Sequence, residues 1–163
     1  MTIDLTSTYM EFNSLLTNSN QVSDLGFANT KSRLRMVTLY QVAAAQSGIV
    51  VGTGNKVEDF GVGFYTKYGD GGVDISPIAD LMKSEVVSLA SSLGIDRRIL
   101  QAPPTDGLWD DDRTDEAQLG LSYSDLEDAM ENKSSINRPK YSQIRQLNLH
   151  KMEPIPVCKM PKS

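Results

Sequence analysis

A glycine-rich segment, Gly52-Thr53-Gly54-Asn55-Lys56-Val57-Glu58, directly follows the apolar run of residues 49–51. Glycines after a strand allow backbone N–H groups to approach a bound ligand closely. The carboxylate of Glu58 is a hard oxygen donor of the kind that magnesium prefers. This combination is typical of a site for an anionic ligand and a metal ion, although a plain turn has the same composition.

A basic cluster near residue 30 is suited to the same kind of ligand. Lys31 and Arg35 lie one helical turn apart, with Arg33 on another face. Guanidinium groups bind phosphate and carboxylate through forked hydrogen bonds. A solvated helix end is the alternative interpretation.

Two further polar groups lie later in the chain. Lys67 and Asp74 flank the loop Tyr68-Gly69-Asp70-Gly71-Gly72, whose glycines permit it to fold over a bound group. Near the chain end, His150 and Lys151 offer two donors for phosphate. An exposed hairpin and an ordinary surface pair are the plainer alternatives.

Composition excludes several other kinds of function. His150 is the only histidine and Cys158 the only cysteine, which leaves no multi-histidine or thiolate zinc site, no Ser-His-Asp triad with sequence support, and no internal disulfide. The net charge of −5, without a Lys/Arg-rich block, argues against nucleic acid and anionic membranes. No stretch approaches the roughly 20 apolar residues of a membrane span. We therefore expect a cytoplasmic protein with small-molecule partners.

Local patterns predict the elements that position these residues. We expect short strands at residues 3–5 and 49–51, the second buried and parallel. We expect helices that start at Thr6 or Ser7, at Asn29 (to residue 46), near residue 78 (to residue 93), at Ser122 (to residue 130) and near residue 141 (to residue 147). Prolines at 154, 156 and 161 predict an extended tail over residues 148–163. The succession predicts an α/β fold with a parallel sheet flanked by helices, in which ligands bind beyond the carboxyl ends of strands.

The string GTGNKVEDFGVGFYTKYGDGGVDISPIADLMKSEV, followed by APPTDGLWDDDRTDEAQLGLSY, resembles the ammonia-dependent NAD synthetases of the ATP-pyrophosphatase superfamily. The resemblance continues from NTKSRLRM to HKMEPIPV and covers essentially the whole chain. It implies a Rossmann-like layered fold of the adenine nucleotide alpha hydrolase type. It also implies ATP-dependent amidation of deamido-NAD by ammonia through an adenylated carboxylate, which yields NAD, AMP and pyrophosphate.

The resemblance assigns roles residue by residue. Thr53, Lys83 and Thr105 match ATP-binding positions, and Glu58 matches a magnesium ligand. One extra residue between Glu58 and Lys67 leaves the alignment of residues 59–63 open. Positions that hold deamido-NAD are matched by Arg33, Lys67, Asp74, His150 and Lys151. A homodimer is implied as well, and the acidic loop 106–118 either closes over the substrate or stays solvated.

The front of the family pattern has no counterpart in the sequence. Relatives begin with a strand, a loop SGGxDS that holds the ATP pyrophosphate, and a helix, whereas no SGG occurs in these 163 residues. We therefore expect residues 1–163 to be the carboxy-terminal part of one NAD synthetase domain, without its first strands, and inactive by itself. The alternatives are a noncatalytic dinucleotide-binding or dimerisation domain derived from such an enzyme and, more remotely, another superfamily member such as a GMP synthetase.

Overall fold

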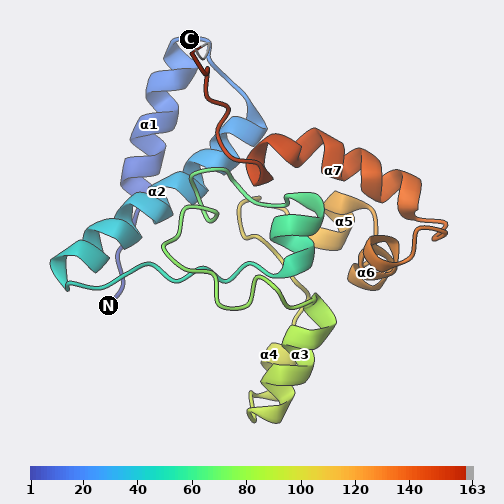
Figure 1. The fold of residues 1–163 in the computed structure, drawn as a ribbon. Coiled ribbons are helices and arrows are strands. Elements are labelled where there is room, and N and C mark those ends of the chain that lie inside the picture. The colour runs from blue at the N-terminus through green and yellow to red at the C-terminus, as the bar shows by residue number, and fades with distance from the viewer. Residues whose placement is uncertain (161–163) are drawn as a thin grey trace.

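The computed structural model describes residues 1–160 of the chain, and this part is helical. The α-helices are α1 (Thr6–Asn18), α2 (Asp24–Ala45), α3 (Lys83–Ser92), α4 (Arg97–Leu100), α5 (Asp115–Leu119), α6 (Tyr123–Glu131) and α7 (Arg138–Met152), and a π-helix, η1, spans Lys56–Val62. Helices α1 and α2 form a pair on one side, α5 to α7 gather around η1 on the other, and α3 with α4 projects away from both (Figure 1).

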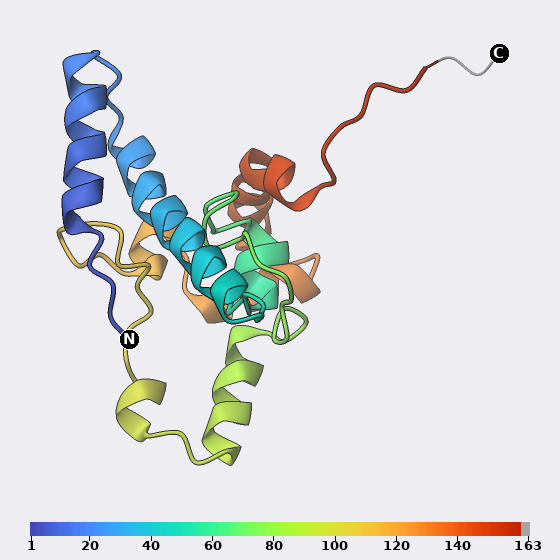
Figure 2. The same ribbon diagram turned by 90° about the vertical axis from the view of Figure 1, so that its left-hand side faces the viewer.

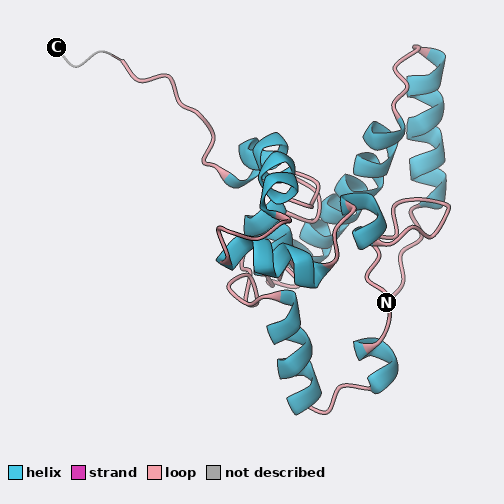
Figure 3. Cartoon of the chain, turned by 90° about the vertical axis from the view of Figure 1, so that its right-hand side faces the viewer, coloured by secondary structure: helices cyan, strands magenta, loops and turns pink. Residues whose placement is uncertain are grey.

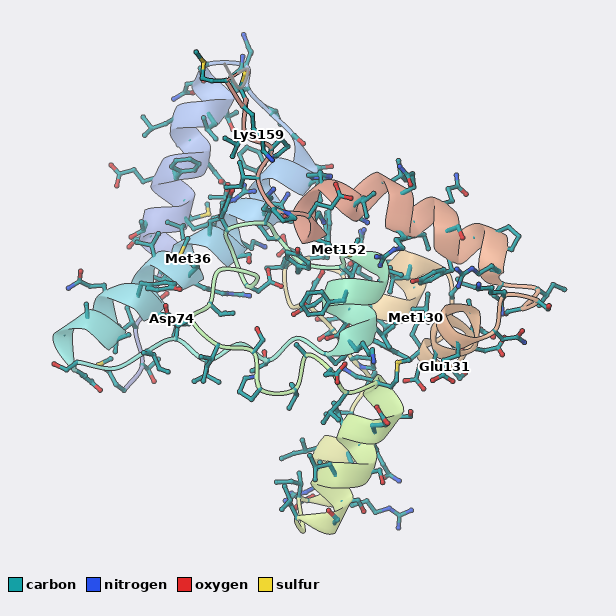
Figure 4. All side chains as sticks on the ribbon, viewed as in Figure 1. Met36, Asp74, Met130, Glu131, Met152 and Lys159 are labelled. Atoms are coloured by element: carbon teal, nitrogen blue, oxygen red, sulfur yellow. The ribbon has the colours of Figure 1, made fainter. Side chains whose placement is uncertain are left out.

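The hydrophobic core lies where η1, α5, α6 and α7 meet. Val57 and Val62 of η1 and Leu126 of α6 are completely buried there. Its other buried members are Leu119, Tyr123, Ala129 and Tyr141. Figure 4 shows Met130, on α6, and Met152, at the end of α7, on two sides of η1. A small core of this kind gains stability by removing apolar side chains from water, and here it fixes the orientation of η1.

Several predicted helices are confirmed, with shifted ends. Helix α6 begins after Ser122, whose hydroxyl accepts a hydrogen bond from the backbone of Asp125, as expected of an N-cap. Helix α2 starts five residues before the predicted Asn29, because Ser23 is its N-cap and accepts from the backbone N–H of Gly26 at 3.2 Å. Asn29 instead accepts a hydrogen bond from the hydroxyl of Thr66 at 2.7 Å.

The predicted parallel sheet is not confirmed. Residues 3–5 form no strand, and residues 49–51 contribute only a single parallel bridge, between Val51 and Ile75. Figure 3 accordingly shows helices and loops throughout residues 1–160. A strand needs neighbours on which to continue its hydrogen-bonded ladder, and within the described residues only the segment around Ile75 pairs with Val51.

The second half of the chain departs from its predicted boundaries in two places. Helix α3 begins at Lys83 rather than near residue 78, because residues 78–81 form turns and the carbonyl of Leu81 accepts from Lys56 N at 2.8 Å. Helix α7 continues to Met152, so the extended segment starts at Glu153 and not at residue 148. It leads away from the other elements (Figure 2), and residues 161–163, with Pro161, lie outside the described part. Among the described helices, none combines the length and apolarity that a membrane span requires.

Candidate functional site

A polar cavity of about 300 Å³ brings together side chains from separated segments of the chain. Its lining includes Thr53, Glu58, Lys83 and Thr105. These are the four residues to which the family resemblance assigns ATP and magnesium, and they come from the glycine-rich segment that runs into η1, from the start of α3 and from the loop after Pro104. The structure thus places them together, although the ligands assigned to them remain predictions.

The position of Glu58 at the start of η1 is fixed by hydrogen bonds with Asn55. Asn55 is the N-cap: its side-chain oxygen accepts from Val57 N at 3.0 Å and Glu58 N at 3.1 Å, while Glu58 Oε2 accepts from Asn55 N at 3.4 Å. This reciprocal arrangement is a capping box. Sequence inspection predicted a turn here, and the asparagine followed by glutamate three residues later is the signal that could have located the helix start.

The Glu58 carboxylate is mostly buried and paired. Its side chain is 16% exposed, and its Oε1 atom lies 3.0 Å from Lys83 Nζ. Burial raises the pKa of Glu58, but hydrogen bonds from Tyr123 and Asn55 and the charge of Lys83 outweigh it, so the net pKa lies below the usual value. Glu58 therefore presents an ionised carboxylate to the cavity.

Sequence inspection missed Tyr123 and Asp115, which complete this cluster. The Tyr123 hydroxyl lies 2.6 Å from Glu58 Oε1 and 3.2 Å from Asp115 Oδ2. Burial, and the hydrogen bond to Glu58, raise the pKa of Tyr123, so the phenol keeps its proton. Burial also raises the pKa of Asp115, whose Oδ1 atom is buried without a hydrogen-bond partner among the described residues. Glu58 and Tyr123 are 65 positions apart, a separation at which sequence carries no contact signal.

Asp59 adds a second carboxylate beside Glu58. Burial, together with the charges of Glu58 and Asp70, raises the pKa of Asp59 to about 6. Its carboxylate packs onto Gly54, where a Cβ atom would overlap both of its oxygens. Only glycine therefore fits at position 54 while Asp59 keeps this position.

A divalent cation is compatible with the donors at this site. No group of three or more His, Cys, Asp or Glu side chains within residues 1–160 is arranged to enclose a metal. Magnesium, however, commonly takes only one or two carboxylates and fills its remaining positions with water and phosphate oxygens. The ionised Glu58, with one long hydrogen bond on Oε2, fits that requirement.

Four of the five residues predicted to hold deamido-NAD form a separate cluster. Lys67 Nζ donates to the carbonyl of His150 at 2.6 Å, and the Arg33 guanidinium donates to the carbonyl of Lys67 at 3.3 Å. Lys151 Nζ donates to the carbonyls of Gly63 and Tyr65 at 2.9 and 2.8 Å. These cationic side chains therefore fasten the end of α7 and the side of α2 to residues 63–67.

Asp74, the fifth of these residues, lies elsewhere. It accepts hydrogen bonds from the Tyr40 hydroxyl at 3.2 Å and from Val50 N at 2.7 Å. Figure 4 shows it beside the later part of α2, well apart from Met152 at the end of α7. The described chain therefore does not bring Asp74 to the other four.

The acidic loop 106–118 is tied to α2. Lys31 Nζ donates to the carbonyl of Leu108 at 2.8 Å and pairs with Asp110 at 3.1 Å. Arg35 donates to the carbonyl of Gly107 at 3.2 Å. Trp109, on the same loop, lines a second cavity of about 220 Å³ that extends to Lys151. Residues 110–113 at the centre of the loop are nevertheless exposed, so closure of the loop over a substrate stays a prediction.

Comparison with known sequences identifies the family. The sequence pattern of NAD synthase matches residues 1–163. The NH(3)-dependent NAD(+) synthetase of Archaeoglobus fulgidus is 42% identical over 144 residues, which are 85% of this chain and 58% of that protein. The enzyme of the same name from Mesoplasma florum is 40% identical over 126 residues, 77% of this chain and 51% of that protein. The chain thus spans a little more than half the length of these curated relatives.

Solved structures agree with this result. An NMN synthetase from Francisella tularensis superposes with a TM-score of 0.88 at 31% identity, over 98% of this chain and 66% of that one. An NAD+ synthetase from Burkholderia pseudomallei gives a TM-score of 0.70 at 30% identity, over 91% of this chain and 58% of that one. Because the family pattern matches residues 1–163, the full length of the given chain, this chain belongs to the NAD synthase family.

Proposed function

We propose that this chain takes part in the ATP-dependent amidation of deamido-NAD by ammonia, which yields NAD, AMP and pyrophosphate. The observation that carries the proposal is the convergence of Thr53, Glu58, Lys83 and Thr105 on one polar cavity. These residues come from three separated segments, and each matches a position that the family uses for ATP or magnesium.

The chemistry explains why such a cavity is needed. A carboxylate is a poor electrophile, so ATP first adenylates it, and ammonia then displaces AMP. Thr53 and Thr105 offer hydroxyls to ATP, and the Lys83 ammonium offers a positive charge near its phosphates. Magnesium, when held by Glu58, offsets the negative charge of the phosphates and of the departing pyrophosphate.

Arg33, Lys67, Asp74, His150 and Lys151 are proposed to bind deamido-NAD. Four of them already lie together, which supports a shared site. The amines of Lys67 and Lys151 now donate to backbone carbonyls, so these side chains must exchange partners to contact a phosphate. We also propose the family's parallel sheet, for which the Val51–Ile75 bridge is a starting pair, and a cytoplasmic homodimer.

A second candidate substrate is nicotinate mononucleotide, whose amidation yields NMN. This candidate comes from the name of the Francisella tularensis NMN synthetase, with which the chain superposes at a TM-score of 0.88 and 31% identity. The amidation chemistry is the same for both substrates, which differ only in whether an adenylate is attached.

A single assay separates these candidates. The 163-residue chain, and the natural protein that carries these residues, are incubated with MgATP and ammonium together with either deamido-NAD or nicotinate mononucleotide, and NAD, NMN and AMP are quantified. We expect AMP and an amidated product from the natural protein and none from the chain alone, because these residues include no SGGxDS loop. Product formation by the chain alone would contradict the second expectation.

Lys83→Met tests the site itself. We expect turnover by the natural protein to fall by roughly 10²- to 10³-fold, since one positive charge near the phosphates is lost. Lys133→Met, an exposed lysine between α6 and α7, is the control and should leave turnover unchanged. Binding of deamido-NAD without any turnover in the natural protein would instead favour a noncatalytic dinucleotide-binding domain.

A further inference from the structure

The Tyr123 hydroxyl makes a short hydrogen bond to a carboxylate in the interior of the site. Tyr123 is 7% exposed, and its oxygen lies 2.6 Å from Glu58 Oε1. This distance is in the range of charge-assisted O–H···O⁻ hydrogen bonds, which are roughly twice as strong as neutral ones. The Tyr123 hydroxyl is the donor of this hydrogen bond, and the carboxylate oxygen accepts it.

The two oxygens of Glu58 are consequently in different environments. Oε1 accepts from both Tyr123 and Lys83 Nζ, whereas Oε2 accepts only from Asn55 N at 3.4 Å. A carboxylate whose Oε1 is fixed in this way cannot rotate freely about its last bond. Oε2 is therefore the oxygen left for a cation that enters the cavity.

The position of Tyr123 is set by the fold and not by the cavity. Tyr123 is the first residue of α6, directly after the Ser122 cap, and its ring packs in the core with Val57 and Leu126. Lys83 Nζ lies 4.8 Å from the centre of the ring, so the same side chain also supports the lysine. Core packing thus delivers the hydroxyl to Glu58 from a rigid element.

We infer that Tyr123 is a positioning residue that holds Glu58 Oε1 and so presents Oε2 to a divalent cation. The inference rests on the proposed role of Glu58 as a metal ligand, and Tyr123 acts only through its hydrogen bond to Glu58. Asp115 is a second acceptor for the same hydroxyl, because its Oδ2 atom lies 3.2 Å from the Tyr123 oxygen. The shorter distance to Glu58 Oε1 indicates that Glu58 accepts the stronger hydrogen bond.

The core supplies a matched control. Tyr141 belongs to the same buried cluster and is 6% exposed, but its hydroxyl makes no hydrogen bond to a residue that the structure describes. Tyr123→Phe and Tyr141→Phe therefore each remove one hydroxyl oxygen from the same hydrophobic core. Only the first removes a contact to Glu58.

The test measures Mn²⁺ binding to the full chain by electron paramagnetic resonance, with thermal unfolding of each variant measured in parallel. Loss of a residue that orients a metal ligand typically weakens metal binding by 10- to 100-fold, so we expect a loss of about that size in Tyr123→Phe and less than about twofold in Tyr141→Phe.

Two outcomes would overturn the inference. The first is unchanged Mn²⁺ affinity in a folded Tyr123→Phe variant. The second, which does not depend on how well Tyr123→Phe folds, is Mn²⁺ affinity that does not change in Glu58→Gln, or that is not measurable in the unmodified chain at millimolar metal. That result would contradict the metal role of Glu58, while amidation itself is decided separately by the turnover assay.

Discussion

Replacement of Asp59 by asparagine should stabilise the protein at neutral and alkaline pH. The Asp59 carboxylate packs on Gly54, and no hydrogen bond to its side chain comes from the described residues. Burial and the neighbouring charges of Glu58 and Asp70 raise its pKa from 3.8 to about 6. The ionised carboxylate is thus less favourable in the folded chain than in the unfolded one.

The magnitude follows from the pKa shift. About two pKa units correspond to roughly 3 kcal/mol in the free energy of unfolding, and partial exposure to solvent reduces this to about 1–2 kcal/mol. Because the folded pKa is the higher one, the stability linked to Asp59 is fully present below pH 3.8 and is lost as the pH rises through about 6. Asp59→Asn should therefore gain about 1–2 kcal/mol at pH 8 and little at pH 4.

The change in the free energy of unfolding at pH 8 and at pH 4 is measured by urea unfolding without added metal. Unfolding is monitored by the fluorescence of Trp109, the only tryptophan. Glu131→Gln removes an exposed carboxylate at the end of α6 and is the control for a change in net charge. An Asp59→Asn variant that is less stable than the unmodified protein at pH 8 would refute the reasoning. A gain of equal size at both pH values would refute it as well.

Two further substitutions test the packing that supports the site. Leu126→Ala, at a completely buried position, should lower the free energy of unfolding in urea by about 2–5 kcal/mol. The control is Leu147→Ala, at a residue on α7 that is 72% exposed. Equal losses of stability in the two variants would contradict the assignment of Leu126 to the hydrophobic core. Lys151→Met keeps the aliphatic stem but loses the hydrogen bonds to the carbonyls of Gly63 and Tyr65, so it should cost about 1–3 kcal/mol in the same assay. A change no larger than that of exposed Lys133→Met would indicate that these contacts do not fasten α7.

Sequence signals predicted those structural features that depend only on residues close together in the chain. The start of α6 at Ser122 was predicted because a cap needs only a hydroxyl and the backbone of the next turn. The predicted start of α2 was wrong because Ser23 and not Asn29 caps the helix, and the contact between Asn29 and Thr66 is not visible in the sequence. The sheet was not confirmed because pairing of residues 49–51 depends on partner strands.

By itself, the sequence determined the family, the residue types available for chemistry and the limits that one histidine and one cysteine place on metal sites. Only the tertiary structure decided which of these residues share a cavity: it gathered Thr53, Glu58, Lys83 and Thr105 and left Asp74 apart from Lys67. It also added Tyr123, whose hydrogen bond to Glu58 spans 65 positions. Such contacts depend on how η1 and α6 pack in the core, and burial and charge act through distances in space that the order of residues does not contain.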